Sequence, residues 1–454
     1  MRAVRRLFVA NRGEIAVRII DACRRLGIET VVGVSTADRE TLAARLADRT
    51  VCIGPPRAPQ SYLKAETLVA AALGSGCDAV HPGYGFLAER PAFQRLCADH
   101  GLLFIGPRAE TIEAMGDKLR ARGLARDLQV PILPGSGHIE SSDQVMRFAE
   151  ANGYPLLLKA SAGGGGRGMR LVYSSEEVVP AWESASAEAR DAFGDPTMYV
   201  ERFIQRARHV EIQLMGDGHG HVVHFGERDC SVQRRYQKLI EEAPSPAVSS
   251  ELRHLLADAA IHLASEVGYL GAGTVEFLLD MDTKEFYFLE MNTRIQVEHP
   301  VTEMVTGVDL VVEQIRSVSG GELTIGQESV RMRGQAIECR INAEMPDQGF
   351  KPSPGRITEW IPPTGYGIRV DSHCYPGYLI PPFYDSMIAK LIVHGHDRAA
   401  ALAGMDRALG SFVVGEVPTT IPFHRRVLAE PTFREGKITT RWVEEDFMLQ
   451  QSVS

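Results

Sequence analysis

The 454-residue sequence lacks the features that mark membrane, secreted and redox proteins. No apolar run approaches the roughly 20 residues that span a bilayer, and the residues after Met1 form no signal-peptide hydrophobic region. The seven cysteines are scattered, odd in number and without a CxxC pair, which argues against a disulfide framework. A net charge of −9 argues against general nucleic-acid binding. We therefore expect a cytoplasmic protein with reduced thiols that binds neither nucleic acid nor membranes.

Lysine is scarce as well. Of the 49 basic residues only eight are lysines, leaving 41 arginines, so the chain uses arginine by default. A lysine inside a conspicuous motif therefore suggests a specific use. Its ammonium group is a compact point donor, which suits phosphate groups and small oxyanions.

The apolar pattern predicts several subdomains, as the length of the chain requires. Residues 1–113 alternate short apolar strands with amphipathic helices such as the one over residues 14–26, which predicts an open parallel α/β domain of Rossmann-like type. Residues 114–131 are predicted to form a helical linker. Residues 132–203 read as a small α+β lid that contains a glycine loop, and residues 204–454 as a strand-rich region.

Two glutamates in a predicted hairpin give the strongest chemical signal. Residues 273–279 and 285–291 read as two strands joined by a short turn. If the turn is tight and the pairing regular, Glu276 on the first strand faces Glu290 on the second. Carboxylates directly opposite each other have Cβ atoms roughly 5 Å apart and repel. The pair is therefore either a solvated surface feature or two halves of a cation site.

A cation between these glutamates would be Mg²⁺ or Mn²⁺. Asn292 follows Glu290 by two residues and adds an amide oxygen to the two carboxylates. Ligands that are all oxygen atoms suit these hard ions better than they suit zinc. We therefore predict a metal site made of Glu276, Glu290 and Asn292.

A glycine run at residues 162–168 contains the pattern GxGxxG. It is followed by a predicted strand, whereas the dinucleotide-binding motif needs a helix there, and no GK[ST] ends it as a Walker motif requires. A glycine run between two strands can close over a polyphosphate with its backbone N–H groups. Lys159 enters this flap from the preceding strand and could reach a phosphate. The flap residues expected to bind ATP are Gly164, Gly165 and Gly166.

Together these parts indicate an ATP–Mg²⁺ site of the ATP-grasp type, and the sequence resembles the biotin carboxylase family over nearly its whole length. The resemblance implies an ATP-grasp fold with an N-terminal parallel α/β domain and a strand-rich C-terminal domain. It also implies carboxylation of biotin on a carrier protein from bicarbonate and ATP, through carboxyphosphate. The motifs that carry it are Asn11–Ile15, His81–Phe86, Met115–Lys118, Arg208–Gln213, Glu227–Ser231, Gln237–Pro244, Glu290–Pro300 and Glu338–Glu344.

The resemblance places bicarbonate in one of these motifs. Bicarbonate is a poor nucleophile until it is deprotonated, so a base must act while cations hold the product. Arg294 can grip a planar oxyanion, and Gln296 and the backbone of Val297 can donate hydrogen bonds. Glu298 is expected to be the general base. By resemblance, Lys238 completes this pocket.

The other site residues also follow from the resemblance. Lys118, Lys159 and two metal ions would spread the charge of phosphoryl transfer. Arg340 matches the arginine that stabilises the biotin enolate, and Tyr84 lies in a motif near biotin. The positions that match residues around the adenine and ribose are Glu201, Arg202, His209, Gln233, Tyr236 and Leu278.

Two departures and two alternatives accompany this prediction. Arg202 stands where a lysine is common, and Tyr236 stands where a histidine is familiar, which puts a protonic role there in doubt.

The sequence has no Met-Lys-Met segment, so we expect a homodimeric subunit that serves a separate biotin carboxyl carrier protein and a separate carboxyltransferase subunit. Acetyl-CoA, for fatty acid synthesis, is the leading acceptor. The alternatives are another ATP-grasp ligase that acts on an amine, and a silent nucleotide-binding regulator.

Overall fold

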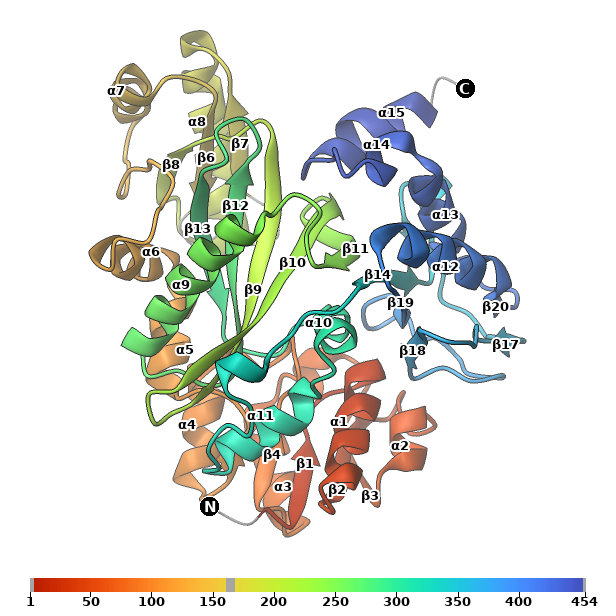
Figure 1. The fold of residues 1–454 in the computed structure, drawn as a ribbon. Helices are drawn as coiled ribbons and strands as arrows, with labels where there is room; N and C mark the ends of the chain where they lie inside the picture. Colours follow the sequence, from red (N-terminus) through yellow and green to blue (C-terminus); the bar gives the residue numbers. More distant parts are fainter. Residues whose placement is uncertain (1–3, 161–167, 452–454) are drawn as a thin grey trace.

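The computed structural model describes residues 4–160 and 168–451. Its N-terminal part is a five-stranded parallel sheet in the order β3-β2-β1-β4-β5, at the bottom of Figure 1. The predicted open parallel α/β arrangement is thereby confirmed. Its elements are β1 (Arg6–Val9), α1 (Gly13–Arg25), β2 (Glu29–Ser35), α2 (Leu42–Leu46), β3 (Arg49–Gly54), α3 (Ala65–Gly74), β4 (Ala79–His81), α4 (Pro91–Asp99) and β5 (Leu103–Phe104).

The strand order of this sheet reverses between β1 and β4. The chain runs outward from β1 to β2 and β3, and then places β4 and β5 on the other side. Ligands of open α/β sheets bind beyond the carboxyl ends of the strands at such a reversal. The segments that follow β1 and β4 are tied together there, because Asn11 Nδ2 donates to the carbonyls of Pro82 at 2.6 Å and Tyr84 at 2.8 Å. Tyr84 therefore lies where this fold places ligands.

The helical linker predicted over residues 114–131 includes only the end of α5 (Ala109–Gly116) and all of α6 (Lys118–Asp127). Asp117 separates them because its carboxylate accepts hydrogen bonds from the N–H groups of Leu119 and Arg120 at 3.0 Å, which caps α6. The break makes Lys118 the first residue of a helix instead of an interior one.

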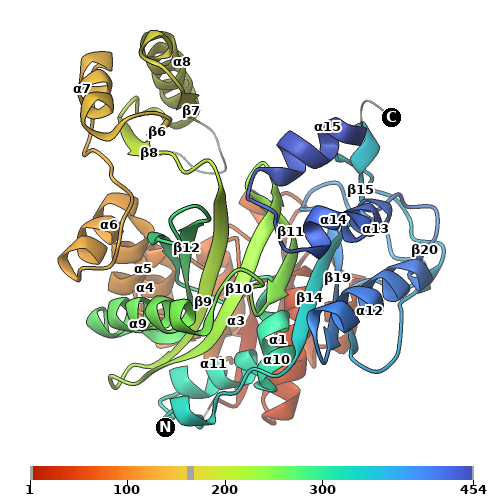
Figure 2. The ribbon, with the colours of Figure 1, turned by 45° about the horizontal axis from the view of Figure 1, so that its top comes forward.

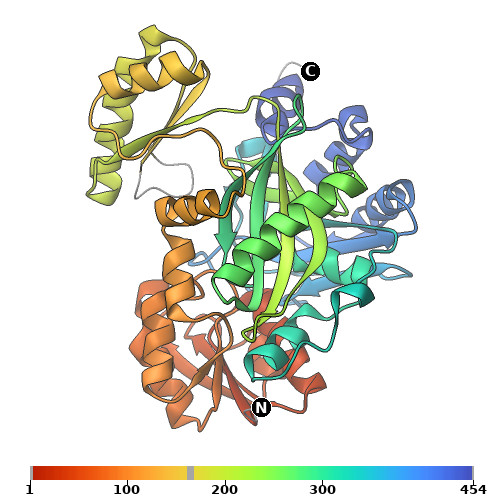
Figure 3. The same ribbon diagram turned by 60° about the vertical axis from the view of Figure 1, so that its left-hand side comes forward.

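The lid is a separate three-stranded antiparallel sheet in the order β7-β6-β8 with two helices. It has its own buried apolar cluster and projects from the rest of the molecule, as Figures 1 and 3 show. The predicted flap residues Gly164, Gly165 and Gly166 lie outside the described residues. The lid elements are α7 (Ser142–Asn152), β6 (Leu156–Ala160), β7 (Met169–Val172), α8 (Ser175–Phe193) and β8 (Met198–Arg202).

One antiparallel sheet of eight strands joins the ATP-grasp core to the C-terminal domain, in the order β13-β12-β9-β10-β11-β14-β19-β18. Helix α9 covers β9 and β10 on one face, as Figure 2 shows. The elements are β9 (Ala207–Asp217), β10 (Val222–Arg234), β11 (Gln237–Ala243), α9 (Ser250–Glu266), β12 (Leu270–Asp280), β13 (Phe286–Asn292), α10 (His299–Thr306), α11 (Leu310–Val318), β14 (Gln335–Asn342), β18 (Ile368–Ser372) and β19 (Met387–Gly395).

The remaining C-terminal elements surround a large apolar cluster on one side of β14 and β19. They include two small two-stranded sheets, β15–β16 and β17–β20. None of the helices in the described part of the chain combines the length and the apolar character needed to cross a membrane. The elements are β15 (Glu344–Met345), β16 (Lys351–Pro352), β17 (Trp360–Ile361), α12 (Arg398–Ser411), β20 (Val413–Val414), α13 (Ile421–Ala429), α14 (Pro431–Arg434) and α15 (Met448–Gln451).

The predicted carboxylate hairpin is present as β12 and β13. Glu276 pairs with Glu290 in register, as expected. The pairing is not regular on both sides, however, because the register shifts directly after this pair and Phe277 faces Phe288. Leu289 is therefore the extra residue of a β-bulge, a device that re-aims nearby side chains.

Candidate active site

A cleft of about 1280 Å³ lies among the lid, the core sheet and the N-terminal domain. It is lined by every predicted site residue that the structure describes. These residues are Tyr84, Lys118, Lys159, Glu201, Arg202, His209, Gln233, Tyr236, Lys238, Glu276, Leu278, Glu290, Asn292, Arg294, Gln296, Val297, Glu298 and Arg340. Residues far apart in the sequence are thus brought to one cavity.

Lys238, the second residue of β11, is bonded to three buried carboxylates in the middle of this cleft. Its Nζ donates to Glu211 at 2.7 Å, Glu276 at 2.9 Å and Glu298 at 2.6 Å. Burial opposes the positive charge, but these carboxylates raise the pKa of Lys238 well above its ordinary value. The lysine is therefore a permanent ammonium that links the metal-ligand candidate Glu276 to the base candidate Glu298.

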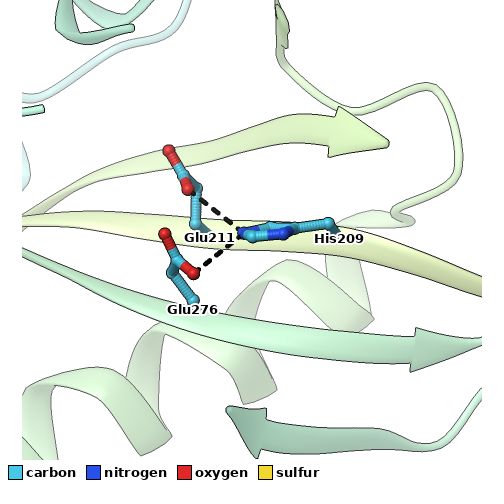
Figure 4. Close-up of side chains that lie close together, drawn as sticks. All are labelled: His209, Glu211 and Glu276. Atoms are coloured by element: carbon cyan, nitrogen blue, oxygen red, sulfur yellow. Dashed lines mark ion pairs between the residues drawn. The ribbon is translucent and has the colours of Figure 1, made fainter. Parts of the chain in front are cut away.

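Glu211 has no predicted role, although it lies in a motif that carries the resemblance. It alternates with His209 along β9, so both side chains leave the same face of the sheet, and it pairs in register with Glu276 on β12. Figure 4 shows the result: His209 Nε2 lies 3.4 Å from Glu211 and 3.2 Å from Glu276. The alternation His-x-Glu, which puts both side chains on one face of the strand, was the available signal.

The charges of this trio follow from the contacts. Burial lowers the pKa of His209, but Glu276 and Glu211 more than reverse that effect and raise it to about 9. His209 is therefore an imidazolium at neutral pH. Ligand atoms of the three residues lie within 4.8 Å of one another. A protonated His209 cannot ligate a metal ion, however, and both carboxylates also contact Lys238, so the trio is an ion-pair cluster.

Glu298 directly precedes α10, at the end of a helix that favours negative charge. Each of its carboxylate oxygens meets a cation: Lys238 at 2.6 Å and Arg340 Nη2 at 2.9 Å. Burial alone would raise the pKa of Glu298, but Lys238 and Arg340 hold it well below its ordinary value. Glu298 is therefore ionised and able to accept a proton.

Arg340 and Arg294 approach this base region with partners that the sequence did not indicate. Arg340 Nε donates to Glu241 at 2.6 Å. Arg294 Nε donates to Glu89 at 2.8 Å, and its Nη2 donates to Asn292 Oδ1 at 2.9 Å. Nothing in the local pattern of Glu89 or Glu241 marks them, because their partners lie on distant segments.

The three metal-ligand candidates share one face of the hairpin, because Glu290 and Asn292 are two residues apart and Glu290 faces Glu276. Lys118 Nζ lies 3.5 Å from Glu290. Two carboxylates and an amide oxygen at one end of the cleft fit Mg²⁺ or Mn²⁺. In this structure Glu276 is paired with Lys238 and Asn292 with Arg294, so side chains now occupy the positions near which a cation would bind.

The opposite ends of the cleft have their own ion pairs. At the lid, Lys159 and Arg122 both contact the buried carboxylate of Glu201. Burial alone would raise the pKa of Glu201, but these two cations lower it. At the N-terminal domain, the Tyr84 hydroxyl donates to Glu14. Arg122 and Glu14 had no predicted role.

Family comparisons match nearly the whole length of this architecture. The biotin carboxylase N-terminal domain family matches residues 3–112 and the biotin carboxylase C-terminal domain family matches residues 338–445. Between them, the family described as the carbamoyl-phosphate synthase L chain, ATP binding domain, matches residues 117–325.

Individual relatives and a solved structure support the same family assignment. The chain is 53% identical to the biotin carboxylase of Nostoc sp. over 97% of this chain and 98% of that protein. It is 51% identical to a pyruvate carboxylase subunit of Methanothermobacter thermautotrophicus over 97% of this chain and 89% of that protein. The biotin carboxylase domain dimer of Hydrogenobacter thermophilus 2-oxoglutarate carboxylase, a complex with MgADP, ADP and bicarbonate, has a TM-score of 0.93, 47% identity and 98% coverage of both chains. With these matches added to the cleft chemistry, the chain belongs to the biotin carboxylase family of ATP-grasp ligases.

Proposed function

We propose that this enzyme carboxylates the biotin of a separate carrier protein, using ATP and bicarbonate. The observation that carries the proposal is the contact set of Glu298, whose two oxygens meet Lys238 and Arg340. One ionised base thus lies between the candidate bicarbonate residues and the candidate biotin residue. This arrangement suits a reaction in which an anion activated at the bicarbonate residues supplies the group that is transferred to biotin beside Arg340.

In the first step, Glu298 takes the proton of bicarbonate as Arg294 and Lys238 hold the resulting anion. Gln296 and the peptide of Val297 supply hydrogen bonds. Lys390 Nζ donates to the Val297 carbonyl at 2.8 Å and so holds the next peptide group, between Val297 and Glu298. Because the fixed donors surround the base, the anion is held where it forms.

In the second step, the anion attacks the γ-phosphate of ATP and ADP leaves. Lys118 and Lys159 neutralise the phosphate charge, and Glu201 orients Lys159 toward the lid end of the cleft. Glu276, Glu290 and Asn292 would hold two Mg²⁺ or Mn²⁺ ions, which supply charge neutralisation on the phosphates when bound. The flap glycines 164–166 would cover the phosphates.

In the third step, carboxyphosphate breaks down to CO₂ and phosphate, and the phosphate removes the ureido proton of biotin. The deprotonated nitrogen then attacks CO₂, which gives carboxybiotin. Arg340 stabilises the negative charge that develops on biotin. Tyr84 lies beside the biotin region, where its hydroxyl is held by Glu14. Residues that would surround the adenine and ribose are Glu201, Arg202, His209, Gln233, Tyr236 and Leu278.

We propose acetyl-CoA as the final acceptor, and a homodimer as the working form together with a carrier protein and a carboxyltransferase subunit. The 53% identity over nearly the whole length to a Nostoc protein named as a biotin carboxylase supports a separate subunit, and the dimeric Hydrogenobacter structure supports the homodimer. Relatives named for pyruvate and 2-oxoglutarate carboxylases share the same half of the reaction, so the acceptor is tested through the partner chain.

The test of the chemistry is ADP formation by the purified chain with free biotin. We expect ATP cleavage that requires both bicarbonate and biotin. Dependence on an amine or amino acid would support a different ATP-grasp ligase, and tight ATP binding without turnover would support a silent regulator. Co-purification followed by identification of the bound carrier and transferase then tests acetyl-CoA against propionyl-CoA, pyruvate, 2-oxoglutarate and urea systems.

A further inference from the structure

Two buried carboxyls lie in the sheet beside Arg340, and the mechanism above uses neither. Glu241 on β11 and Glu338 on β14 face each other in register, and both are fully buried. Facing residues on antiparallel strands have Cβ atoms about 4.5–5.5 Å apart. Glu338 precedes Arg340 by two residues on β14, so both side chains leave the sheet on the same face. The pair therefore flanks the arginine that we assign to biotin.

Only one member of the pair has a cationic partner. Arg340 Nε donates to Glu241 Oε1 at 2.6 Å. On its other side Glu338 faces Ile392 of β19, which can neither donate nor carry charge. Among the described residues, Glu241 Oε2 and both oxygens of Glu338 have no hydrogen-bond partner. These three atoms belong to neighbouring side chains, so a single proton on Glu338 would give Glu241 Oε2 and one Glu338 oxygen a hydrogen-bond partner.

The nearest other cation is committed elsewhere. Lys390 on β19 is opposite Arg340, but its Nζ lies 3.1 Å from Glu14 and donates to the Val297 carbonyl at 2.8 Å. A second ionised carboxyl beside Glu241 would therefore be buried without a bonded counter-charge, which is strongly unfavourable.

The charged groups around Glu338 also favour its protonated form. Burial is the largest effect, and Glu241 and Glu298 reinforce it, whereas Lys390 and Arg340 oppose it. The net effect raises the pKa of Glu338 well above its ordinary value. Burial also raises the pKa of Glu241, against the effect of Arg340. Because the two sites interact, they bind a proton as a pair.

We propose that Glu338 carries a proton in the working enzyme and shares it with Glu241, so that the pair holds one negative charge and Glu241 acts as the positioning residue for Arg340. This inference rests on the proposed role of Arg340. A protonated carboxyl has one O–H donor, which Glu241 Oε2 can accept. Arg340 is then balanced by one buried charge and by Glu298, with no excess negative charge beside it.

This balance matters when Glu298 accepts its proton. Arg340 then loses its contact with an anion at Glu298 and keeps only Glu241, so its remaining positive charge is available to biotin. If Glu338 were ionised as well, two buried negative charges would attract the guanidinium toward the sheet and cancel its field in the cleft. The shared proton thus keeps Arg340 effective toward the substrate.

Infrared spectroscopy tests the proton directly, without any assay of activity. The full chain and its Glu338→Gln variant are compared at pH 7. We expect the wild-type spectrum to contain the carbonyl stretch of a protonated carboxylic acid that is missing from the variant. If the variant instead loses carboxylate stretches, Glu338 is ionised and the proposal is overturned. This result stands whether or not the chain carboxylates biotin.

Kinetics with free biotin tests the positioning role through two matched variants, since glutamine preserves shape at both positions. Glu338→Gln should keep kcat within about threefold, whereas Glu241→Gln should lower kcat at least about tenfold and leave the KM for ATP unchanged, because it removes the charge that holds Arg340. Equal tolerance of both changes would overturn the positioning role, and equal loss would overturn the protonated state of Glu338. A wild-type enzyme without biotin-dependent turnover would reject the proposed function instead.

Discussion

Replacing Lys238 by methionine should destabilise the centre of the ATP-grasp sheet. The ammonium contacts Glu211, Glu276 and Glu298 at 2.6–2.9 Å and is mostly buried. Removal of one partner from a buried ion pair costs about 3–5 kcal/mol. Methionine fills the volume without its charge, so the expected loss is electrostatic.

The size of the loss is limited by the cations that remain. Glu211 keeps Arg228 Nε at 2.6 Å, and Glu298 keeps Arg340 at 2.9 Å. Glu276 keeps its imidazolium partner at 3.2 Å. No carboxylate of the three is therefore left wholly unpaired, and we expect a cost of about 3 kcal/mol, at the lower end of the range for broken buried pairs.

Lys118→Met is the matched control. Lys118 also lines the cleft and lies 3.5 Å from Glu290, but its side chain is 44% exposed, against 12% for Lys238. Exposed pairs contribute about 0–1 kcal/mol. Both variants should lose activity, so the contrast between them lies in stability alone.

Hydrogen exchange of the amides in β9, β11 and β12 measures this local stability. A cost of about 3 kcal/mol should speed exchange in Lys238→Met on the order of 100-fold, with little change in Lys118→Met. Equal exchange in the two variants, or none above wild type, would refute the view that Lys238 stabilises the carboxylate cluster.

The same experiment has a defined pH dependence. Lys238 lowers the pKa of Glu298 in the folded protein against the effect of burial. A carboxylate with a lowered pKa adds stability above its unfolded value of about 4.3, and this stability is lost as the pH falls toward the folded value. The difference between wild type and Lys238→Met should therefore be largest at pH 7 and narrow below about pH 4.5.

Three further outcomes are expected. Glu298→Gln should lose at least about 100-fold in biotin-dependent ADP formation and still bind ATP, because an amide cannot act as the base; normal turnover would remove that role. Lys159→Ala should weaken ATP binding at least about tenfold in calorimetry, since a charge-assisted contact is lost, and an unchanged Kd would argue against its phosphate contact. Burial lowers the pKa of His424 to about 4, so wild type should lose up to about 3 kcal/mol between pH 6.5 and 4; thermal unfolding of His424→Gln should lack that part of the loss, and parallel curves would contradict it.

Much of the fold follows from local pattern. The helix predicted over residues 14–26 is Gly13–Arg25, because its apolar positions are those that pack on the parallel sheet. The facing of Glu276 and Glu290 was predictable because a short hairpin restricts its own register. The bulge that follows was not, since a one-residue shift depends on what the two strands pack against. The subdomain boundaries at 113, 131 and 203 stay a prediction.

The site was harder to predict where both faces of a strand are covered. Arg340 alternates with Cys339 and Ile341, a pattern that predicts an exposed charged face, yet its side chain is only 17% exposed. The covering side chains come from α10 and from the other strands of the sheet. The partner Glu241 was missed for the same reason, because a buried ion pair has no local periodicity. Beyond the carboxylate hairpin, Asn292, Lys159 and the flap glycines, the resemblance to a family supplied the residues, and the structure supplied their contacts.

The eight-stranded sheet runs without interruption from Glu290 on β13 to β14 and beyond, past Arg340. The metal-ligand candidates on β12 and β13 and the biotin candidate Arg340 on β14 therefore belong to one hydrogen-bonded frame, which fixes the distance between them. The lid has its own sheet and its own core, so it is not part of this hydrogen-bonded frame. Substitutions at the metal-ligand candidates or at the biotin candidate can then be designed separately, provided that the strands between them are unchanged.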